Sequence, residues 1–219
     1  MSGDTLETHS VPTLTHGRVL AVQARASAAR GLLVGFHGYG ENAAIQMERL
    51  RAIPGSAAWT LVSVQGLHRF YDRRTEQVVA SWMTQEDRED AIADNIGYLT
   101  AALESVPHDP SKPAVFAGFS QGVAMAYRAA CRGSRRAAAV IAVGGDVPPE
   151  LLHDPDVTFP RVLMIRGSRD EWYRQQKFED DTAALRARGV ALQPLLVEGG
   201  HEWHEPVIAA VRELLESFR

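Results

Sequence analysis

The chain has 219 residues, of which 45% are hydrophobic and 23% charged, and its formal net charge is −4. This length and composition suit one domain over residues 1–219 with a full hydrophobic core. The slight acidic balance, without a run of like charges, argues against nucleic-acid binding. No apolar run is long enough to span a bilayer.

The first residues and the single cysteine bear on the cellular compartment. Residues 1–10 lack the basic and apolar regions of a signal peptide, so the expected location is cytoplasmic. Cys131 has no second cysteine to pair with, and its place in an apolar segment predicts a buried structural thiol.

The first half of the chain predicts a hairpin followed by alternating strands and helices. Residues 11–14 and 18–24 read as two short strands of an antiparallel hairpin. The apolar run at 31–36 is typical of a strand covered on both faces. It ends in HGYGEN, after which we expect a helix over 43–53 with Asn42 as its N-cap.

The next elements are a buried strand at 59–64 and a helix at 86–105. Residues 65–85, between them, are expected to form a long irregular loop. Such a loop in a compact domain is usually functional or mobile.

The second half continues the alternation. Strands are expected at 113–117, 137–143, 161–165 and 192–197, helices at 123–131, 172–188 and 206–218, and a Pro-rich loop at 147–160. Gly189 is the expected C-cap of the helix before it. The chain is therefore expected to be an α/β protein with a mostly parallel central sheet and helices on both faces.

The segment GFSQG at 118–122 lies between a predicted strand and a predicted helix. In that setting Gly-x-Ser-x-Gly is typical of a nucleophile elbow, with Ser120 at the tip of a strained turn. The glycines allow strand and helix to approach closely, and the helix N-terminus favours developing negative charge. The bare motif also arises by chance, so the partner residues must decide.

A catalytic serine needs a base and a carboxylate that orients the base, in the chain order Ser, acid, His on this architecture. Asp170 follows one predicted strand, and His201 follows the last strand after two glycines. Their rivals are Asp146, at the end of the preceding strand, and His204, near the terminal helix. His68 and His153 fit poorly.

Arg166 and Arg169 lie close to Asp170 in sequence. They either lower the pKa of this carboxyl or are solvated surface charges, and the sequence leaves both readings open.

An oxyanion hole needs two donors, one from the residue after the nucleophile and one from the loop after the third strand. These are the backbone N–H groups of Gln121 and Tyr39. The expected walls of the substrate cleft come from His37 and Gly38, and from Trp82, Met83 and Trp172. Each of these aromatic residues can equally belong to the core.

With GFSQG, HGYG at 37–40, Asp170 and the GGH ending at His201, the sequence resembles the phospholipase/carboxylesterase family of α/β-hydrolases. That family includes bacterial carboxylesterases and acyl-protein thioesterases, and the resemblance extends over nearly the whole chain. It implies an α/β-hydrolase fold without a lid domain. The sequence departs from the family at Glu41, where Asp is usual, and at 69–72, where the thioesterases carry Trp-Phe-Asp.

The resemblance implies a serine hydrolase that cleaves carboxylic esters through an acyl-enzyme. Residues 144–160 are too few to form a helical cap domain, so we expect an open, shallow cleft and a preference for short to medium acyl groups. No metal or organic cofactor is expected, the expected partner is a small-molecule ester, and a homodimer is compatible with the sequence. Two alternatives remain: an acyl-thioesterase or lysophospholipase, and a ligand-binding module on a hydrolase scaffold.

Overall fold

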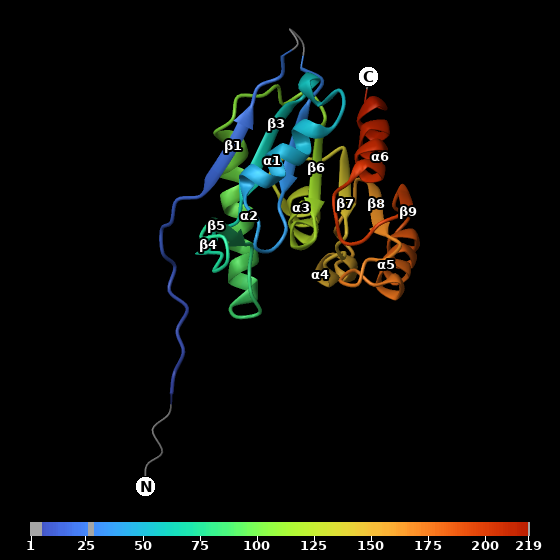
Figure 1. Ribbon diagram of the computed structural model, residues 1–219. Coiled ribbons are helices and arrows are strands. Elements are labelled where there is room, and N and C mark those ends of the chain that lie inside the picture. The colour runs from blue at the N-terminus through green and yellow to red at the C-terminus, as the bar shows by residue number, and fades with distance from the viewer. Residues whose placement is uncertain (1–5, 26–28, 219) are drawn as a thin grey trace.

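The structure, a computed structural model, describes residues 6–25 and 29–218. Its centre is a seven-stranded sheet with the strand order β1-β3-β2-β6-β7-β8-β9 (Figure 1). The strands are β1 (Arg18–Val22), β2 (Leu32–Phe36), β3 (Thr60–Gln65), β6 (Ala114–Phe119), β7 (Ala139–Val143), β8 (Arg161–Gly167) and β9 (Leu192–Val197). All neighbours run parallel except β1, which pairs antiparallel with β3. The expectation of a mostly parallel sheet is confirmed.

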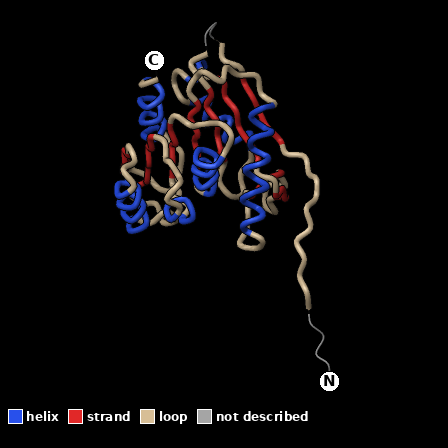
Figure 2. Tube along the Cα trace, turned by 180° about the vertical axis from the view of Figure 1, so that it is seen from behind, coloured by secondary structure: helices blue, strands red, loops and turns tan. Residues whose placement is uncertain are grey.

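Helices cover both faces of the sheet, as the sequence predicts. They are α1 (Ala43–Ala52), α2 (Arg88–Glu104), α3 (Gln121–Arg132), α4 (Pro149–His153), α5 (Gln175–Ala187) and α6 (Glu205–Glu216), with a 3₁₀ turn at Ser56–Ala58. The helices α1 and α6 pack on one face, and α2, α3 and α5 on the other (Figure 1, and from behind in Figure 2).

The side chains of β6 divide the core into two layers. Phe116 packs in the layer under α2 and α3, whereas Val115 and Phe119 pack in the layer under α1 and α6. This alternation follows the period of two of a strand, and burial on both faces explains why the run is continuously apolar. The carboxyl ends of the parallel strands meet at one edge, where sites in such sheets form.

The predicted N-cap is confirmed. The Asn42 side chain accepts hydrogen bonds from the backbone N–H groups of Ala44 (3.0 Å) and Ile45 (3.1 Å) at the start of α1. The predicted C-cap is off by one residue: Arg188 is the C-cap of α5, and Gly189 follows it with φ +67°, a left-handed conformation that suits glycine.

The predicted N-terminal hairpin is wrong. Residues 11–14 form no strand, and the side chains of Val11 and Leu14 are 72% and 94% exposed. The antiparallel pair of the sheet is formed instead by β1 and β3, with Arg18 opposite Gln65 and Val22 opposite Leu61. A strand gains more from the free edge of a buried sheet than from a two-stranded hairpin, which is marginally stable alone.

The irregular loop predicted at 65–85 is also wrong, because this segment contains a hairpin of β4 (His68–Tyr71) and β5 (Val78–Ser81). The Asp72 carboxylate closes its turn by accepting hydrogen bonds from the backbone N–H groups of Arg74 and Thr75. β5 then reaches the loop after β2, where the Ala80 N–H donates to the Glu41 carbonyl at 2.7 Å.

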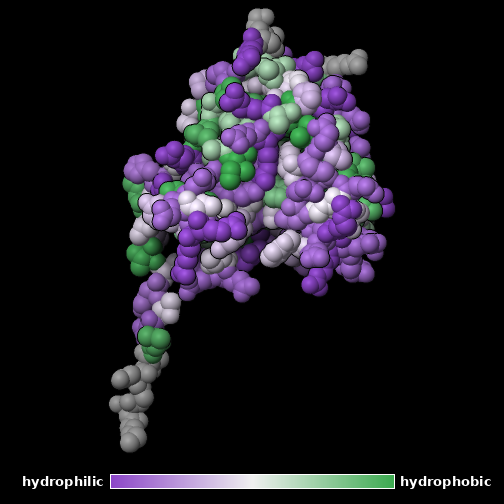
Figure 3. Space-filling model, viewed as in Figure 1, coloured by the Kyte–Doolittle hydropathy of each residue, from purple (hydrophilic) through white to green (hydrophobic). Residues whose placement is uncertain are grey.

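The Pro-rich segment after β7 holds only the five-residue helix α4, so no lid is evident among the described residues. In the same part of the chain, none of the helices combines the length and apolar character needed to cross a bilayer. The face shown in Figure 3 is mostly hydrophilic, with hydrophobic residues in small groups between. Scattered apolar residues of this kind are usual on a protein surface.

The close approach of backbone segments at Gly122 generates a prediction about stability. A Cβ at this position would lie 2.2 Å from the Phe36 carbonyl oxygen, so Gly122→Ala should lower the free energy of unfolding by about 3 kcal/mol. Gly97, inside α2, has no atom within 4 Å of such a Cβ. Gly97→Ala should therefore raise stability by about 0.5–1 kcal/mol. Urea denaturation measures both, and equal effects of the two changes would contradict the packing at the elbow.

Candidate active site

Ser120 lies at the sharp turn between β6 and α3. Its backbone has φ +52° and ψ −122°, a strained conformation for a residue with a side chain. The strain is held by packing, because a Cβ at Gly118 would meet the Gly122 carbonyl oxygen at 2.4 Å. Ser120 is therefore held, partly buried, between a strand end and a helix N-terminus.

Asp170 and His201 are hydrogen-bonded to each other. The Asp170 Oδ2 lies 2.8 Å from Nδ1 of His201, and its Oδ1 accepts the backbone N–H groups of Trp172 and Tyr173, each at 2.9 Å. These N–H bonds also explain why α5 begins at Gln175 and not at residue 172. A carboxylate at Nδ1 requires the hydrogen on that nitrogen, which leaves Nε2 of His201 as an acceptor.

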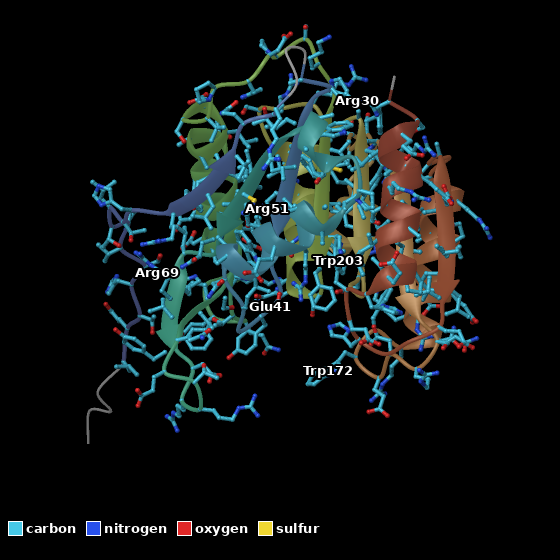
Figure 4. The ribbon with its side chains drawn as sticks, turned by 45° about the horizontal axis from the view of Figure 1, so that its top comes forward. Arg30, Glu41, Arg51, Arg69, Trp172 and Trp203 are labelled. Atoms are coloured by element: carbon cyan, nitrogen blue, oxygen red, sulfur yellow. The ribbon has the colours of Figure 1, made fainter. Side chains whose placement is uncertain are left out.

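Ser120 and His201 line the same cleft of about 320 Å³ at the carboxyl edge of the sheet. Among the described residues, no hydrogen bond joins the Ser120 hydroxyl to the His201 ring. Such bonds are often long in free enzymes and shorten when substrate binds. Phe119 and Trp172 flank the imidazole, with ring centroids 5.0 and 6.4 Å from it. Trp172 is 84% exposed and stands at this edge in Figure 4.

The rival residues of the sequence lie elsewhere or make other contacts. Asp146 lines the same cleft and is exposed, but Asp170 is the carboxylate bonded to His201. His204 donates from Nε2 to the Glu198 carbonyl at 2.6 Å and so supports the turn before His201. His68 is exposed on β4, and His153 ends α4.

Arg166 is buried and bonds to backbone carbonyl groups. It donates to the carbonyl oxygens of Asp170 (3.0 Å) and Tyr173 (2.7 Å), and so holds the loop that carries the carboxylate. Arg169 is exposed, which agrees with a solvated surface charge.

The loop after β2 passes directly over Ser120. A Cβ at Gly38 would lie 3.1 Å from Glu41 Oε2 and 3.3 Å from the Ser120 Cβ, so a side chain there would be crowded. Within residues 6–25 and 29–218, no acceptor is found for the backbone N–H of Tyr39 or of Gln121. Both donors are therefore free for the oxyanion hole that the sequence predicts at Tyr39 and Gln121.

Four of the five expected cleft residues do not line the cleft with Ser120, so these predictions are wrong. His37, Gly38, Trp82 and Met83 are buried, whereas Trp172 lines the cleft as expected. His37 Nε2 accepts the Gly66 N–H at 3.0 Å, so its Nδ1 carries the hydrogen and donates to the Gly38 carbonyl at 2.7 Å. Burial lowers the pKa of His37, which keeps this imidazole neutral.

The side chain of Gln121 has a role that sequence reasoning missed. Its Oε1 accepts the Trp82 N–H at 3.0 Å, and its Nε2 donates to the Met83 carbonyl at 3.0 Å. The amide therefore fastens the end of β5 to the first residue of α3. The only signal in the sequence is the glutamine of GFSQG itself, since a polar side chain at a helix start can also face solvent.

Glu41 and Arg49 form an ion pair that holds the loop after β2, residues 37–42, which we call the oxyanion loop after the role expected for its Tyr39 N–H. Both Arg49 guanidinium nitrogens lie 2.6 Å from the Glu41 carboxylate, which also accepts the Gly38 N–H at 2.8 Å. The two side chains are 19% and 17% exposed. Burial alone would raise the pKa of Glu41, but the hydrogen bonds and charge of Arg49 outweigh it, and the pKa is lowered.

This ion pair predicts a pH-dependent contribution to stability. Glu41→Gln should lower the free energy of unfolding at pH 7 by about 2–3 kcal/mol, because it leaves Arg49 mostly buried and unpaired. Because the pKa of Glu41 is lower in the folded protein than in the unfolded chain, its ionised form stabilises the fold at pH values above the pKa of free Glu, about 4.3. This stabilisation is lost as the pH falls through the folded pKa. The difference between wild type and variant should therefore shrink below about pH 4.

Urea denaturation from pH 7 to pH 3 measures the effect, with Glu48→Gln on the exposed side of α1 as the control. The control should change stability by less than about 0.5 kcal/mol. A difference for Glu41→Gln that stays constant over this pH range would contradict the assignment.

Solved structures with this architecture include several esterases. Esterase PE8 aligns with 94% of this chain and 100% of its own at a TM-score of 0.76 and 19% identity. Acyl-protein thioesterase 2 of Zea mays aligns with 93% of this chain and 99% of its own at a TM-score of 0.70 and 17% identity. The Bacillus cereus carboxylesterase aligns with 93% of this chain and 95% of its own at a TM-score of 0.70 and 15% identity. At these identities the likeness shows the fold alone.

No match to a curated protein sequence was found. The family model described as Phospholipase/Carboxylesterase matches residues 18–155, from β1 to the loop after α4. The matched region is well over half of the chain, and the protein therefore belongs to the phospholipase/carboxylesterase family of α/β-hydrolases and is a hydrolase.

Proposed function

We propose that the protein is a serine esterase that cleaves carboxylic esters through a covalent acyl-enzyme. The observation that carries this proposal is the hydrogen bond from His201 to the buried Asp170, which leaves Nε2 free in the cleft that holds Ser120. The positive φ of Ser120 at the elbow supports it, since strain of this kind is retained at functional residues.

In the first half of the reaction, the Ser120 hydroxyl oxygen attacks the ester carbonyl carbon while His201 Nε2 takes its proton. Asp170 fixes the tautomer and stabilises the imidazolium that forms. The backbone N–H groups of Tyr39 and Gln121 donate to the oxyanion. Collapse of the tetrahedral intermediate breaks the ester bond, His201 returns the proton to the leaving alcohol, and the acyl group stays on Ser120.

In the second half, His201 takes a proton from water, and the hydroxyl attacks the acyl-enzyme. The same donors stabilise the second oxyanion, and the carboxylic acid leaves as Ser120 regains its proton. Loss of one oxyanion donor costs about 10²–10³ in rate in comparable enzymes. The ion pair of Glu41 with Arg49 supports this function indirectly, because it holds the loop that carries the Tyr39 N–H.

The cleft suits a small ester. Its volume is about 320 Å³, at the lower end of the range for small-molecule sites. Trp172 is the exposed aromatic residue that lines it, whereas Trp82 and Met83 are buried elsewhere. A thioesterase or lysophospholipase acting on long acyl chains would need a longer apolar wall than these residues provide.

The proposal predicts that Ser120→Ala abolishes ester hydrolysis without unfolding the protein. Comparable nucleophile substitutions lower kcat by about 10⁶. The measurement is the hydrolysis of 4-nitrophenyl acetate, together with covalent labelling by a fluorophosphonate probe. Wild type that neither turns over esters nor reacts with the probe would indicate a ligand-binding module instead. A variant that keeps a tenth of the activity would exclude Ser120 as the nucleophile.

Two matched pairs of substitutions test the roles proposed for Asp170 and His201. Asp170→Asn should lower kcat by about 10⁴, as loss of the orienting carboxylate does elsewhere, and Asp146→Asn should lower it far less. His201→Ala should be inactive, whereas His204→Ala, which affects only the supporting turn, should keep most of its activity. The reverse order in either pair would move the catalytic role to the rival residue.

The small cleft predicts a preference for short to medium acyl chains. Each buried methylene contributes about 0.8 kcal/mol only while there is a wall to cover it, so kcat/KM should stop rising early in the series from acetyl to palmitoyl esters. With no lid among the described residues, the rate should not jump when substrate forms micelles. An optimum at the palmitoyl ester, or the corresponding thioester, would favour the thioesterase alternative.

A further inference from the structure

The cleft contains a charged side chain that ester hydrolysis as described above does not use. Lys177, in the first turn of α5, lines the cleft together with Ser120, His201 and Trp172. Its side chain is 41% exposed, so the ammonium group is accessible from the cleft. A lysine beside the nucleophile bears on which substrates can bind there.

Lys177 is anchored by a buried carboxylate. The Lys177 ammonium bonds to Oδ1 of Asp181, whose side chain is 2% exposed. The other oxygen of Asp181 accepts the Tyr173 hydroxyl at 2.8 Å and the Val147 N–H at 3.2 Å. The carboxylate is thus shared among three donors, and the ammonium group, which has three N–H bonds, keeps two of them for other acceptors.

This arrangement lowers the entropic cost of binding an anion. A free lysine side chain loses up to about 2 kcal/mol of rotamer entropy when it is fixed, but Lys177 is already held by Asp181. The second charged group that lines the cleft is Asp146, which is exposed. Because Asp146 is exposed, solvent and salt screen its repulsion of an anion in the cleft.

We propose that Lys177 recognises a carboxylate on the substrate, so that the preferred esters carry a negative charge close to the scissile bond. This inference rests on the proposed esterase function and names its substrate class. Ser120 and Lys177 lie on the walls of one cleft of about 320 Å³, so the carboxylate must be separated from the ester by only a few bonds. It belongs either to the acyl part or to the alcohol part of the ester.

A purely structural role makes a different prediction. If Lys177 served only to neutralise Asp181, its loss would lower stability and leave the ratio of rates on charged and neutral esters unchanged. The ratio of kcat/KM values therefore separates recognition from support.

The test compares esters of matched shape and different charge. For the acyl part these are monoethyl succinate, ethyl pentanoate and the ethyl ester of 4-(trimethylammonio)butanoate, followed by pH-stat titration. For the alcohol part they are 4-acetoxybenzoate and 4-acetoxybenzamide, followed by absorbance. In at least one of the two series, kcat/KM for the anionic ester should be about ten times that for the neutral ester, which corresponds to about 1.4 kcal/mol. A preference for the cationic ester, or no preference in either series, would overturn the proposal.

Variants assign the preference to Lys177. Lys177→Met should remove the tenfold ratio, and Lys177→Arg should retain most of it. The double change Lys177→Met with Asp181→Asn avoids a buried unpaired carboxylate and should also lack the preference. Asp146→Asn should raise the ratio, because it removes a like charge from the cleft. An unchanged ratio in a folded double variant would overturn the role of Lys177.

Failure of the esterase proposal would be recognised separately. If the wild type hydrolyses none of these esters, binding still tests Lys177: succinate should raise the melting temperature, and neutral succinamide should not. The shift should be lost in the double variant. Equal effects of the two compounds, or no effect of succinate, would exclude carboxylate recognition whatever the enzyme's reaction is.

Discussion

The close approach of backbone segments around Ser120 is the constraint on which the rest of the site depends. A Cβ at Gly122 would meet the Phe36 carbonyl at 2.2 Å, and one at Gly145 would meet the Ser120 carbonyl at 2.4 Å. The ends of β2, β6 and β7 therefore touch the start of α3 without side chains between them. This contact holds the serine at positive φ and brings the helix N-terminus, with its free N–H, beside the oxyanion loop.

The polar residues around this contact act mainly on main-chain groups. His37 bonds to the backbone of Gly66 and Gly38, Gln121 to that of residues 82 and 83, and Arg166 to the carbonyl groups of the loop that holds Asp170. Buried polar side chains are tolerated because these bonds satisfy them. The reactive groups are thereby positioned by the paths of the loops, and each loop is fixed by at least one such bond.

Sequence patterns predicted the parallel sheet, the N-cap of α1 and the residues that meet at the carboxyl edge, because each depends on local periodicity or on a short motif. They failed where the structure of a segment depends on strand pairing with a distant part of the chain. Residues 11–14 look like a strand, yet Leu14 finds no partner, while β1 pairs with β3 some 40 residues along the chain. The position of Trp82, buried against the oxyanion loop, likewise depends on β5 pairing with Glu41, and an aromatic residue in a polar stretch gives no signal of that contact.

The contact between the β4–β5 hairpin and the oxyanion loop has a consequence for how this enzyme diverges. Main-chain hydrogen bonds that join them run from Gly40 N to the Ala80 carbonyl and from Ala80 N to the Glu41 carbonyl, and the Asn42 side chain adds a bond to the Val78 carbonyl at 3.1 Å. The ring of Phe70 on β4 also lies against the ring of Tyr39, with a centroid distance of 5.7 Å, whereas Tyr71 is 72% exposed. Mutations at exposed hairpin positions outside these contacts, such as Tyr71, can therefore accumulate while the main-chain junction with the loop is kept.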